Sequence, residues 1–318
     1  MADTSPIRIG ISSCLLGQHV RFDGGHKRDA FLVDTFGVFV EWVPVCPEVE
    51  LGLGTPRESL RLVRKGDLVH MVNGKSGRDI TVEMRRYARA RVEALAGEHL
   101  AGYVLKKDSP SCGMERVKVY GESGMAEKSG RGLFAEALLE RFPRLPVEEE
   151  GRLCDPRLRD NFVERVFAYV RLRALFGARW TTGDLVRFHT AHKMALLAHS
   201  PEMYVELGRL VARAKSLDRA GLESRYRELF MDALAKVATT RKQTNVLQHM
   251  VGHFKDLLDA DEKQELLGTV EDYRRGLLPL VVPLTLIKHH VRRHKVEYLA
   301  GQVYLDPHPK ELMLRNHV

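Results

Sequence analysis

Hydrophobic residues in the first half of the chain fall into short runs that alternate with longer amphipathic stretches. Runs rich in β-branched and aromatic residues predict strands over Ile7–Ser12, Val38–Val45 and Ala101–Lys106. Apolar residues at helical spacing predict helices over Thr81–Gly97 and Gly132–Phe142. Strands that alternate with helices are typical of an α/β domain with a mostly parallel sheet.

The second half changes to an almost continuous helical pattern. Between the halves, residues 142–162 are rich in proline and charge, as is common at a domain junction. We therefore expect an α/β domain over residues 1–150, followed by an all-α domain over residues 151–318. Two helices are expected between residues 260 and 300. Five more are expected over Asn161–Phe176, Thr182–His199, Pro201–Ser216, Ser224–Thr239 and Gln243–Leu258.

The net charge of +8 belongs to the second half alone. Residues 1–150 hold 22 Lys and Arg against 22 Asp and Glu, whereas residues 151–318 hold 28 against 20 and ten of the fourteen histidines. A basic domain indicates an anionic partner, and a solvated basic surface explains the charge equally well.

One segment concentrates this positive charge. "TLIKHHVRRHKVEYLAG" (Thr285–Gly301) places Ile287, Val291 and Tyr298 on an apolar helical face, with basic residues on the other. No compact RNA-recognition motif accompanies it, so contacts with an RNA would go mainly to phosphates. The candidate RNA-binding residues are Arg241, Lys242, Lys288, Arg292, Arg293 and Lys295.

The N-terminal sequence "MADTSPIRIG" lacks the basic start and apolar core of a secretory signal. The longest apolar run, Leu277–Ile287, is too short to span a bilayer and is broken by Pro279 and Pro283. We expect a cytoplasmic protein without a membrane partner. Four cysteines in a reducing compartment bind metal, act chemically or are buried more often than they form disulfides.

Cys14, Cys46 and Cys112 each follow a predicted strand and stand in a loop rich in Gly, Pro and Ser. In a parallel sheet the carboxyl ends of the strands meet at one edge, so the three loops can converge on one site. Cys154 lies in the junction and is expected to be no ligand.

Three thiolates would leave one iron of a four-iron cluster without a protein ligand, and thiolates suit iron–sulfur clusters. The residues alone leave three other interpretations open. These are a three-cysteine zinc site with a bound water, a lone nucleophilic cysteine, and three buried structural cysteines.

Three long motifs now point to a family. "SSCLLGQHVRFDGGHK" (Ser12–Lys27), "VCPEVELGLGTPR" (Val45–Arg57) and "LKKDSPSCG" (Leu105–Gly113) resemble the motifs of TudS-type thiouracil desulfurases. The second half resembles the helical YbgA-like domain. The fusion of the two resembles the RudS-type desulfidases, which are linked to removal of sulfur from 4-thiouridine in tRNA.

The resemblance implies that Cys14, Cys46 and Cys112 hold a 4Fe-4S cluster. It also implies that Glu48 is the catalytic carboxylate and Ser109 the catalytic serine. The sequence departs from the family at Phe22, where tyrosine is commoner. This departure touches no ligand, but it removes a hydroxyl group.

The expected activity is hydrolysis of the C–S bond of 4-thiouridine in tRNA, which yields uridine and hydrosulfide without net redox change. Glu48 would take a proton from the attacking water, and Ser109 would hydrogen-bond the base. One alternative is desulfuration of free thiouracil or thionucleosides, with the helical domain used for oligomerisation. Another is a cluster-bearing RNA-binding or sensor protein without turnover.

Overall fold

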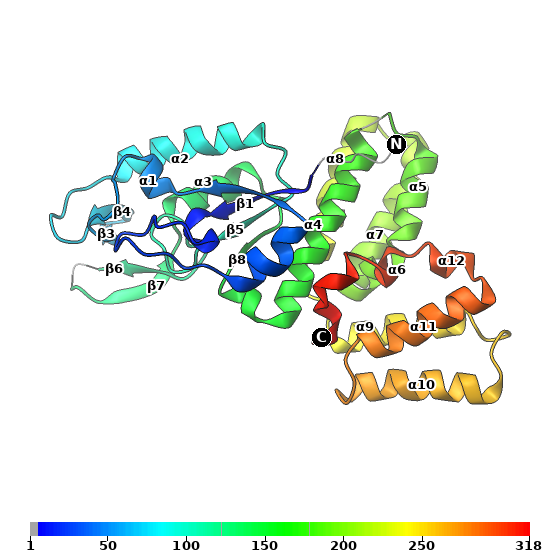
Figure 1. Ribbon diagram of the computed structural model, residues 1–318. Coiled ribbons are helices and arrows are strands. Elements are labelled where there is room, and N and C mark those ends of the chain that lie inside the picture. Colours follow the sequence, from blue (N-terminus) through cyan, green and yellow to red (C-terminus); the bar gives the residue numbers. More distant parts are fainter. Residues whose placement is uncertain (1–5, 122, 178) are drawn as a thin grey trace. The chain divides into compact units, whose positions relative to one another are not determined.

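A computed structural model describes residues 6–121, 123–177 and 179–318 (Figure 1). The chain divides into two compact units, Met1–Cys154 and Asp155–Val318, at a point four residues beyond the expected boundary. Within the described residues, every helix is too short or too polar to cross a bilayer.

The first unit is built on a parallel sheet with the strand order β2-β1-β5-β8. Its strands are β1 (Arg8–Ser12), β2 (Glu41–Val45), β5 (Gly102–Leu105) and β8 (Val147–Glu149). The first three lie inside the runs predicted as strands, and the prediction of an α/β fold with a parallel sheet is confirmed. Helices α2 (Thr81–Ala96) and α3 (Leu133–Arg141) pack against each other beside the sheets.

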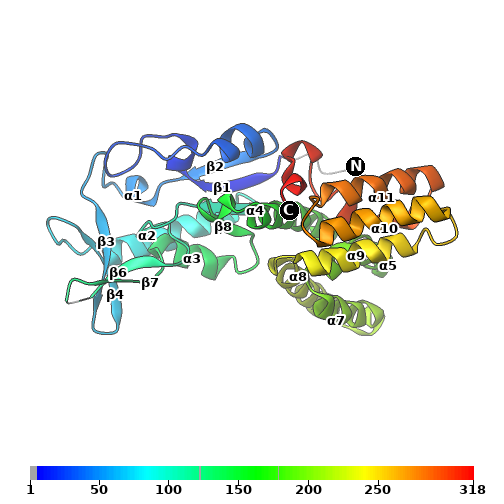
Figure 2. The ribbon, with the colours of Figure 1, turned by 90° about the horizontal axis from the view of Figure 1, so that it is seen from below.

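A second sheet lies at one end of the first unit (Figure 2) and has the order β4-β3-β6-β7. It consists of β3 (Leu60–Lys65), β4 (Leu68–Asn73), β6 (Val117–Tyr120) and β7 (Ala126–Gly130). The hydrophobic pattern did not predict this sheet. Charged residues interrupt β3, β6 and β7, and β7 exposes nearly all of its residues to solvent, so these three strands show no long apolar run. β4 is largely apolar and could have been predicted from its sequence.

The second unit is helical throughout its described residues, as predicted. Its helices are α4 (Pro156–Gly177), α5 (Thr182–Ala191), α6 (Lys193–His199), α7 (Pro201–Ala212), α8 (Arg219–Ala235), α9 (Thr240–Gly252), α10 (Ala260–Arg274), α11 (Val281–His294) and α12 (Glu297–Ala300).

Two of the predicted helices are in fact interrupted. The segment expected as one helix over Thr182–His199 is broken at His192, whose Nδ1 lies 2.8 Å from the carbonyl oxygen of Phe188. The basic segment after Thr285 stays helical only to His294, because Lys295 adopts a left-handed conformation with φ of 52°. The apolar spacing continues across both breaks, so periodicity alone could not find them.

A buried charged cluster lies within the second unit. His308 Nε2 lies 2.9 Å from Asp160, and Arg315 Nη2 lies 3.5 Å from Glu164, which also faces His199. Burial by itself would raise the pKa of Glu164, but the charges of His199 and Arg315 outweigh burial and lower it. The cluster therefore ties Arg315 to α4 through buried ion pairs, which are costly to break singly.

Gly10 of β1 is required by close packing. A Cβ atom at this position would lie 2.1 Å from the ring of Tyr103, which has no exposed surface. We expect Gly10→Ala to lower the free energy of unfolding of the first unit by about 1–3 kcal/mol through overpacking. Urea unfolding followed by Trp42 fluorescence in a Trp180→Phe background measures this unit alone.

Gly97→Ala is the matched control for this substitution. A Cβ at Gly97 would lie no closer than 3.6 Å to its neighbours, and the residue has an ordinary helical φ of −75°. Equal unfolding midpoints for the two variants would contradict the packing argument.

Candidate active site

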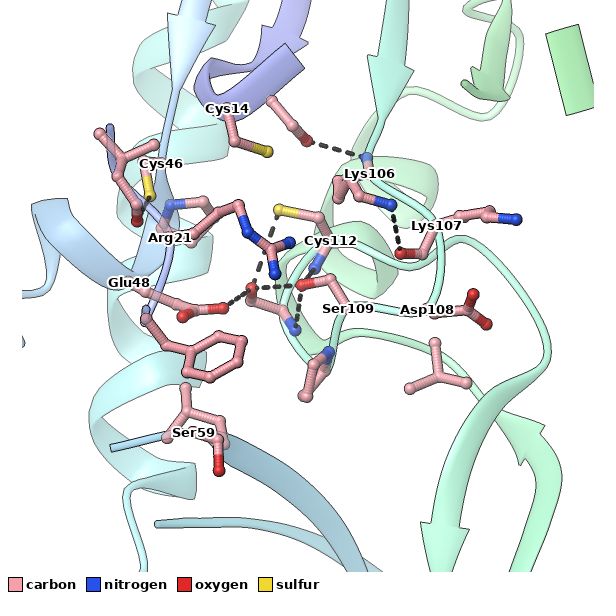
Figure 3. Close-up of a pocket in the computed structure, with 18 of the residues that line it drawn as sticks. Cys14, Arg21, Cys46, Glu48, Ser59, Lys106, Lys107, Asp108, Ser109 and Cys112 are labelled. Carbon is pink, nitrogen blue, oxygen red and sulfur yellow. Dashed lines mark hydrogen bonds between the residues drawn. The ribbon is translucent and has the colours of Figure 1, made fainter. Parts of the chain in front are cut away.

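The three cysteines stand where adjacent strands of the parallel sheet end. Cys14 lies in a short 3-10 helix (Ser13–Leu16) directly after β1, and Cys46 caps the N-terminus of α1 (Pro47–Glu50) directly after β2. Cys112 lies in the loop that follows β5. Because β2, β1 and β5 are neighbours in the sheet, their carboxyl ends bring the three loops to one edge (Figure 3).

These loops surround a cavity of about 500 Å³ that all three cysteines line. Glu48 and Ser109 line it too, so the structure brings together every candidate site residue of the first half. Cys14 and Cys112 are buried, and Cys46 is half-buried. Cys154 is exposed and does not line the cavity. Among the described residues, no three His, Cys, Asp or Glu side chains lie close enough to hold a single metal ion.

Burial raises the pKa of each of the three thiols. The pKa of Cys14 rises from 9.0 to about 11, against a smaller lowering by the nearby Lys106. Desolvation raises the pKa of Cys46, and it raises that of the fully enclosed Cys112 further. Without a bound metal the three thiols hold their protons near neutral pH. A metal that binds them must release those protons.

Glu48 is held by two partners, one on each carboxylate oxygen. Its Oε1 accepts a hydrogen bond of 2.6 Å from the hydroxyl of Ser111. Its Oε2 accepts from the guanidinium of Arg57, with Nε at 2.9 Å, and the Arg57 side chain is only 6% exposed. Arg57 Nη2 also donates to the carbonyl oxygen of Val20 at 3.0 Å. This arginine therefore joins the first cysteine loop to the helix that carries Glu48.

Ser109 does not contact Glu48 directly in this arrangement. Its hydroxyl lies 3.0 Å from that of Ser111 and accepts hydrogen bonds from the backbone N–H groups of Ser111 and Cys112. Ser109, Ser111 and Glu48 thus form a continuous hydrogen-bonded row along the cavity wall. Ser111 and Arg57 both stand inside the three motifs, but the sequence pattern predicted no role for either residue.

The candidate RNA-binding residues of the second unit divide into two groups. Arg241, Arg292 and Lys295 are exposed, and within the described chain they make no ion pair. The other three are engaged internally: Lys242 donates to the carbonyl oxygen of His199, Lys288 pairs with Asp306, and Arg293 pairs with Glu262. The exposed positive charge is therefore smaller than the sequence indicated.

The first unit is an α/β domain whose parallel sheet gathers three thiols and a carboxylate, held by Arg57 and Ser111, into one cavity. Residues 9–150 match the 2-thiouracil desulfurase family, and residues 193–309 match the family described as a protein of unknown function (DUF1722). The chain belongs to the 2-thiouracil desulfurase family in its first unit and to the YbgA-like family in its second. The expected resemblance to a TudS-type desulfurase joined to a YbgA-like domain, and the expected desulfurase class of enzyme, are confirmed.

Two relatives each correspond to part of the chain. The uncharacterized protein YbgA of Escherichia coli (strain K12) is 35% identical over 163 residues, which are 50% of this chain and 95% of YbgA. The uncharacterized protein YbbK of Bacillus subtilis (strain 168) is 32% identical over 151 residues, which are 44% of this chain and 95% of YbbK. A solved structure described as the [4Fe-4S]-dependent thiouracil desulfidase TudS is 34% identical. It covers 46% of this chain and 93% of its own, with a TM-score of 0.38.

The raised thiol pKa predicts slow alkylation of the metal-free chain. A pKa near 11 for Cys14 makes its thiolate fraction at pH 8 about 100-fold smaller than that of a thiol with the ordinary value of 9.0. We expect iodoacetamide at pH 8 to modify exposed Cys154 first and Cys14 and Cys112 slowly, with the rate at Cys14 rising as the pH approaches 11. Peptide mass spectrometry measures each site. Rates at Cys14 equal to those at Cys154 throughout this pH range would contradict the expectation.

Proposed function

We propose that the protein is a 4Fe-4S-dependent desulfidase that converts 4-thiouridine in tRNA to uridine and releases hydrosulfide. The observation that carries this proposal is the convergence of three free cysteines and the Ser111–Glu48 hydrogen bond on a single cavity. Membership of the 2-thiouracil desulfurase family supports the class of reaction.

The donor set of the cavity fits an iron–sulfur cluster. Cys14, Cys46 and Cys112 supply three soft thiolates once their protons have left, and no histidine is among the residues that line the cavity. A cluster with three protein thiolates keeps one iron without a protein ligand. When bound, it supplies a Lewis acid that polarises the thiocarbonyl bond of the base.

Glu48 is placed to act on the attacking water. As general base it takes one proton from the water, whose oxygen forms the new bond to the ring carbon. The C–S bond then breaks, the second proton of the water leaves with the sulfur as hydrosulfide, and the carbon keeps its oxidation state. Arg57 holds Oε2 of Glu48, so that the carboxylate keeps one orientation during this transfer.

The two serines extend the path of the proton. Ser111 donates to Glu48, and Ser109 lies within hydrogen-bond distance of Ser111. A proton taken up at Glu48 can move along this row toward the base. Ser109 is then the group that hydrogen-bonds the ring as charge develops on it.

The assignment to tRNA is supported by the charge of the second unit. Residues 151–318 carry the whole net charge of +8, and Arg241, Arg292 and Lys295 are exposed on them. A second candidate, desulfuration of free thiouracil or thionucleosides with the helical unit used for oligomerisation, is favoured by the family itself, which is named for a free base.

The decisive experiment is anaerobic cluster reconstitution, followed by incubation with 4-thiouridine-containing tRNA and with 4-thiouracil. Loss of thiocarbonyl absorbance measures turnover. We expect the wild-type protein to turn over both and to prefer tRNA, and Glu48→Gln to lose about 10²–10⁴-fold in kcat with its cluster absorbance intact.

Cys154→Ser is the control for cluster loading in this experiment. Because Cys154 lies outside the cavity, this variant should load and react like the wild type, whereas Cys112→Ser should lose the cluster absorbance. A fully loaded wild-type protein that acts on neither substrate would refute the enzyme assignment. Undiminished turnover by Glu48→Gln would refute its role as general base.

The helical unit's contribution to tRNA binding can be tested separately. Substituting alanine for Arg241, Arg292 and Lys295 together should weaken tRNA binding and reduce the slope of log Kd against log salt concentration by about 2 to 3. Fluorescence anisotropy with labelled tRNA measures both quantities.

The matched control replaces three other exposed cations of the same unit, Arg209, Arg213 and Lys215, with alanine. The total change in charge is the same. An equal loss in the two triple variants would mean that overall charge, rather than these three positions, determines tRNA binding.

A further inference from the structure

The lining of the cavity in the first unit is strongly basic, although residues 1–150 carry no net charge. Two carboxylates, Glu48 and Asp108, line the cavity. The cations that line it are Arg21, Lys27, Arg57, Arg61, Lys106, Lys107 and Lys118. The concentration of positive charge is therefore a property of this site and not of the unit as a whole.

Some of these cations are neutralised within the chain. Arg57 pairs with Glu48, Lys106 with Glu150, and Arg21 with Asp23. The other four, Lys27, Arg61, Lys107 and Lys118, are exposed and make no ion pair with any residue that the structure describes. These four remain available for an anionic ligand.

Arg61, Lys118 and Lys128 form a row across three adjacent strands of the second sheet. In the register of the sheet, Lys118 of β6 lies opposite Lys128 of β7, next to a β-bulge. Leu62 of β3 lies opposite Val119 of β6, so Arg61, one residue before Leu62, lies beside Lys118. Neighbouring strands are about 4.8 Å apart, so the row spans about 10 Å. Like charges directly opposite each other destabilise a sheet, and an anionic ligand bound between these residues would offset their repulsion.

The basic surface continues into a second, smaller cavity of about 280 Å³. This cavity shares Lys107 and Asp108 with the first and adds Lys128 and Arg116 to its lining. Its remaining carboxylates are engaged within the chain: Glu115 pairs with Arg152, and Glu149 accepts a hydrogen bond from the backbone N–H of Met114. The exposed residues Lys107, Arg116 and Lys128 thus extend the positive charge outward from the catalytic cavity as a cationic track, with the carboxylate of Asp108 among them.

Two aromatic rings stand beside this track. Tyr120 lines the catalytic cavity and lies under the guanidinium of Arg61, whose Cζ is 5.9 Å from the ring centre. Phe22 lines the same cavity with 42% of its surface exposed. The Phe22 ring is exposed and the Tyr120 ring is half-buried. Accessible rings beside unpaired cations are the combination that binds single-stranded nucleic acid, by base stacking and phosphate contacts.

We propose that Arg61, Lys118 and Lys128 bind the phosphates of the RNA strand that flanks the thiolated nucleotide. They thereby make the desulfurase unit itself selective for RNA over the free base. This inference rests on the proposed function, and it assigns RNA recognition to the catalytic unit in addition to the helical one. The three residues are determinants of specificity and take no part in breaking the C–S bond.

The test compares Arg61→Ala/Lys118→Ala/Lys128→Ala with a control of equal charge change, Arg64→Ala/Arg86→Ala/Arg89→Ala, in the full chain. The control cations are exposed residues of the same unit that line neither cavity. Two readouts are used. One is the anisotropy of a labelled single-stranded oligoribonucleotide with one 4-thiouridine, and the other is turnover of that RNA and of 4-thiouracil by cluster-loaded protein.

We expect the first triple variant to bind the RNA about tenfold or more weakly, with a salt slope reduced by about 2. Its kcat/KM should fall by a larger factor for the RNA than for 4-thiouracil, because the free base carries no phosphate for these residues to bind. The control variant should resemble the wild type in each measurement. Equal effects of the two triple variants on RNA binding, or an equal loss of turnover on both substrates, would overturn the inference.

Failure of the proposed function would give a different experimental result. If loaded wild-type protein acted on neither substrate, the desulfidase proposal would fall. The anisotropy comparison would still decide whether the cationic track binds RNA.

Discussion

The order of three strands determines what the rest of this protein can do. Since β2, β1 and β5 are parallel neighbours, the loops that leave them must emerge at one edge of the sheet, and Cys14, Cys46 and Cys112 each stand in one of those loops. Residues far apart in sequence thereby become one donor set. Gly10 contributes to this geometry because β1 can approach Tyr103 of β5 only where no side chain intervenes.

Arg57, the last residue of the second motif, connects two of the loops at this edge of the sheet. Arg57 donates to Glu48 on one side and to the Val20 carbonyl oxygen on the other, so it links the first cysteine loop to α1. Cys46 also donates weakly to the same carbonyl oxygen, at 3.8 Å. A carboxylate held in this way keeps one orientation through a proton transfer, which lowers the cost of reorganisation during catalysis.

Sequence reasoning recovers features that depend on local patterns and loses those that depend on how distant segments meet. The strands that precede the cysteines, and the helices of the second unit, follow from hydrophobic spacing. The Ser111–Glu48 bond joins residues 63 positions apart, and it depends on the path of the Cys112 loop, which spacing does not specify. In the second sheet, β7 buries too little to show an apolar run, whereas the apolar β4 could have been predicted. The helix breaks at His192 and Lys295 were missed because the apolar pattern continues through them.

The buried ion pairs of the second unit have a consequence for synthesis. Arg315 meets Glu164 across 151 residues, so α4 leaves the ribosome long before its partner has been made. Until Arg315 has been synthesised, the Glu164 carboxylate, which is buried in the folded unit, lacks one of the cations that stabilise its charge. The α/β unit, whose strands are all present once Glu149 has emerged, can fold during this time. The sheet that carries the cysteine loops is therefore complete in the nascent chain before the helical unit has all the partners of its buried charges.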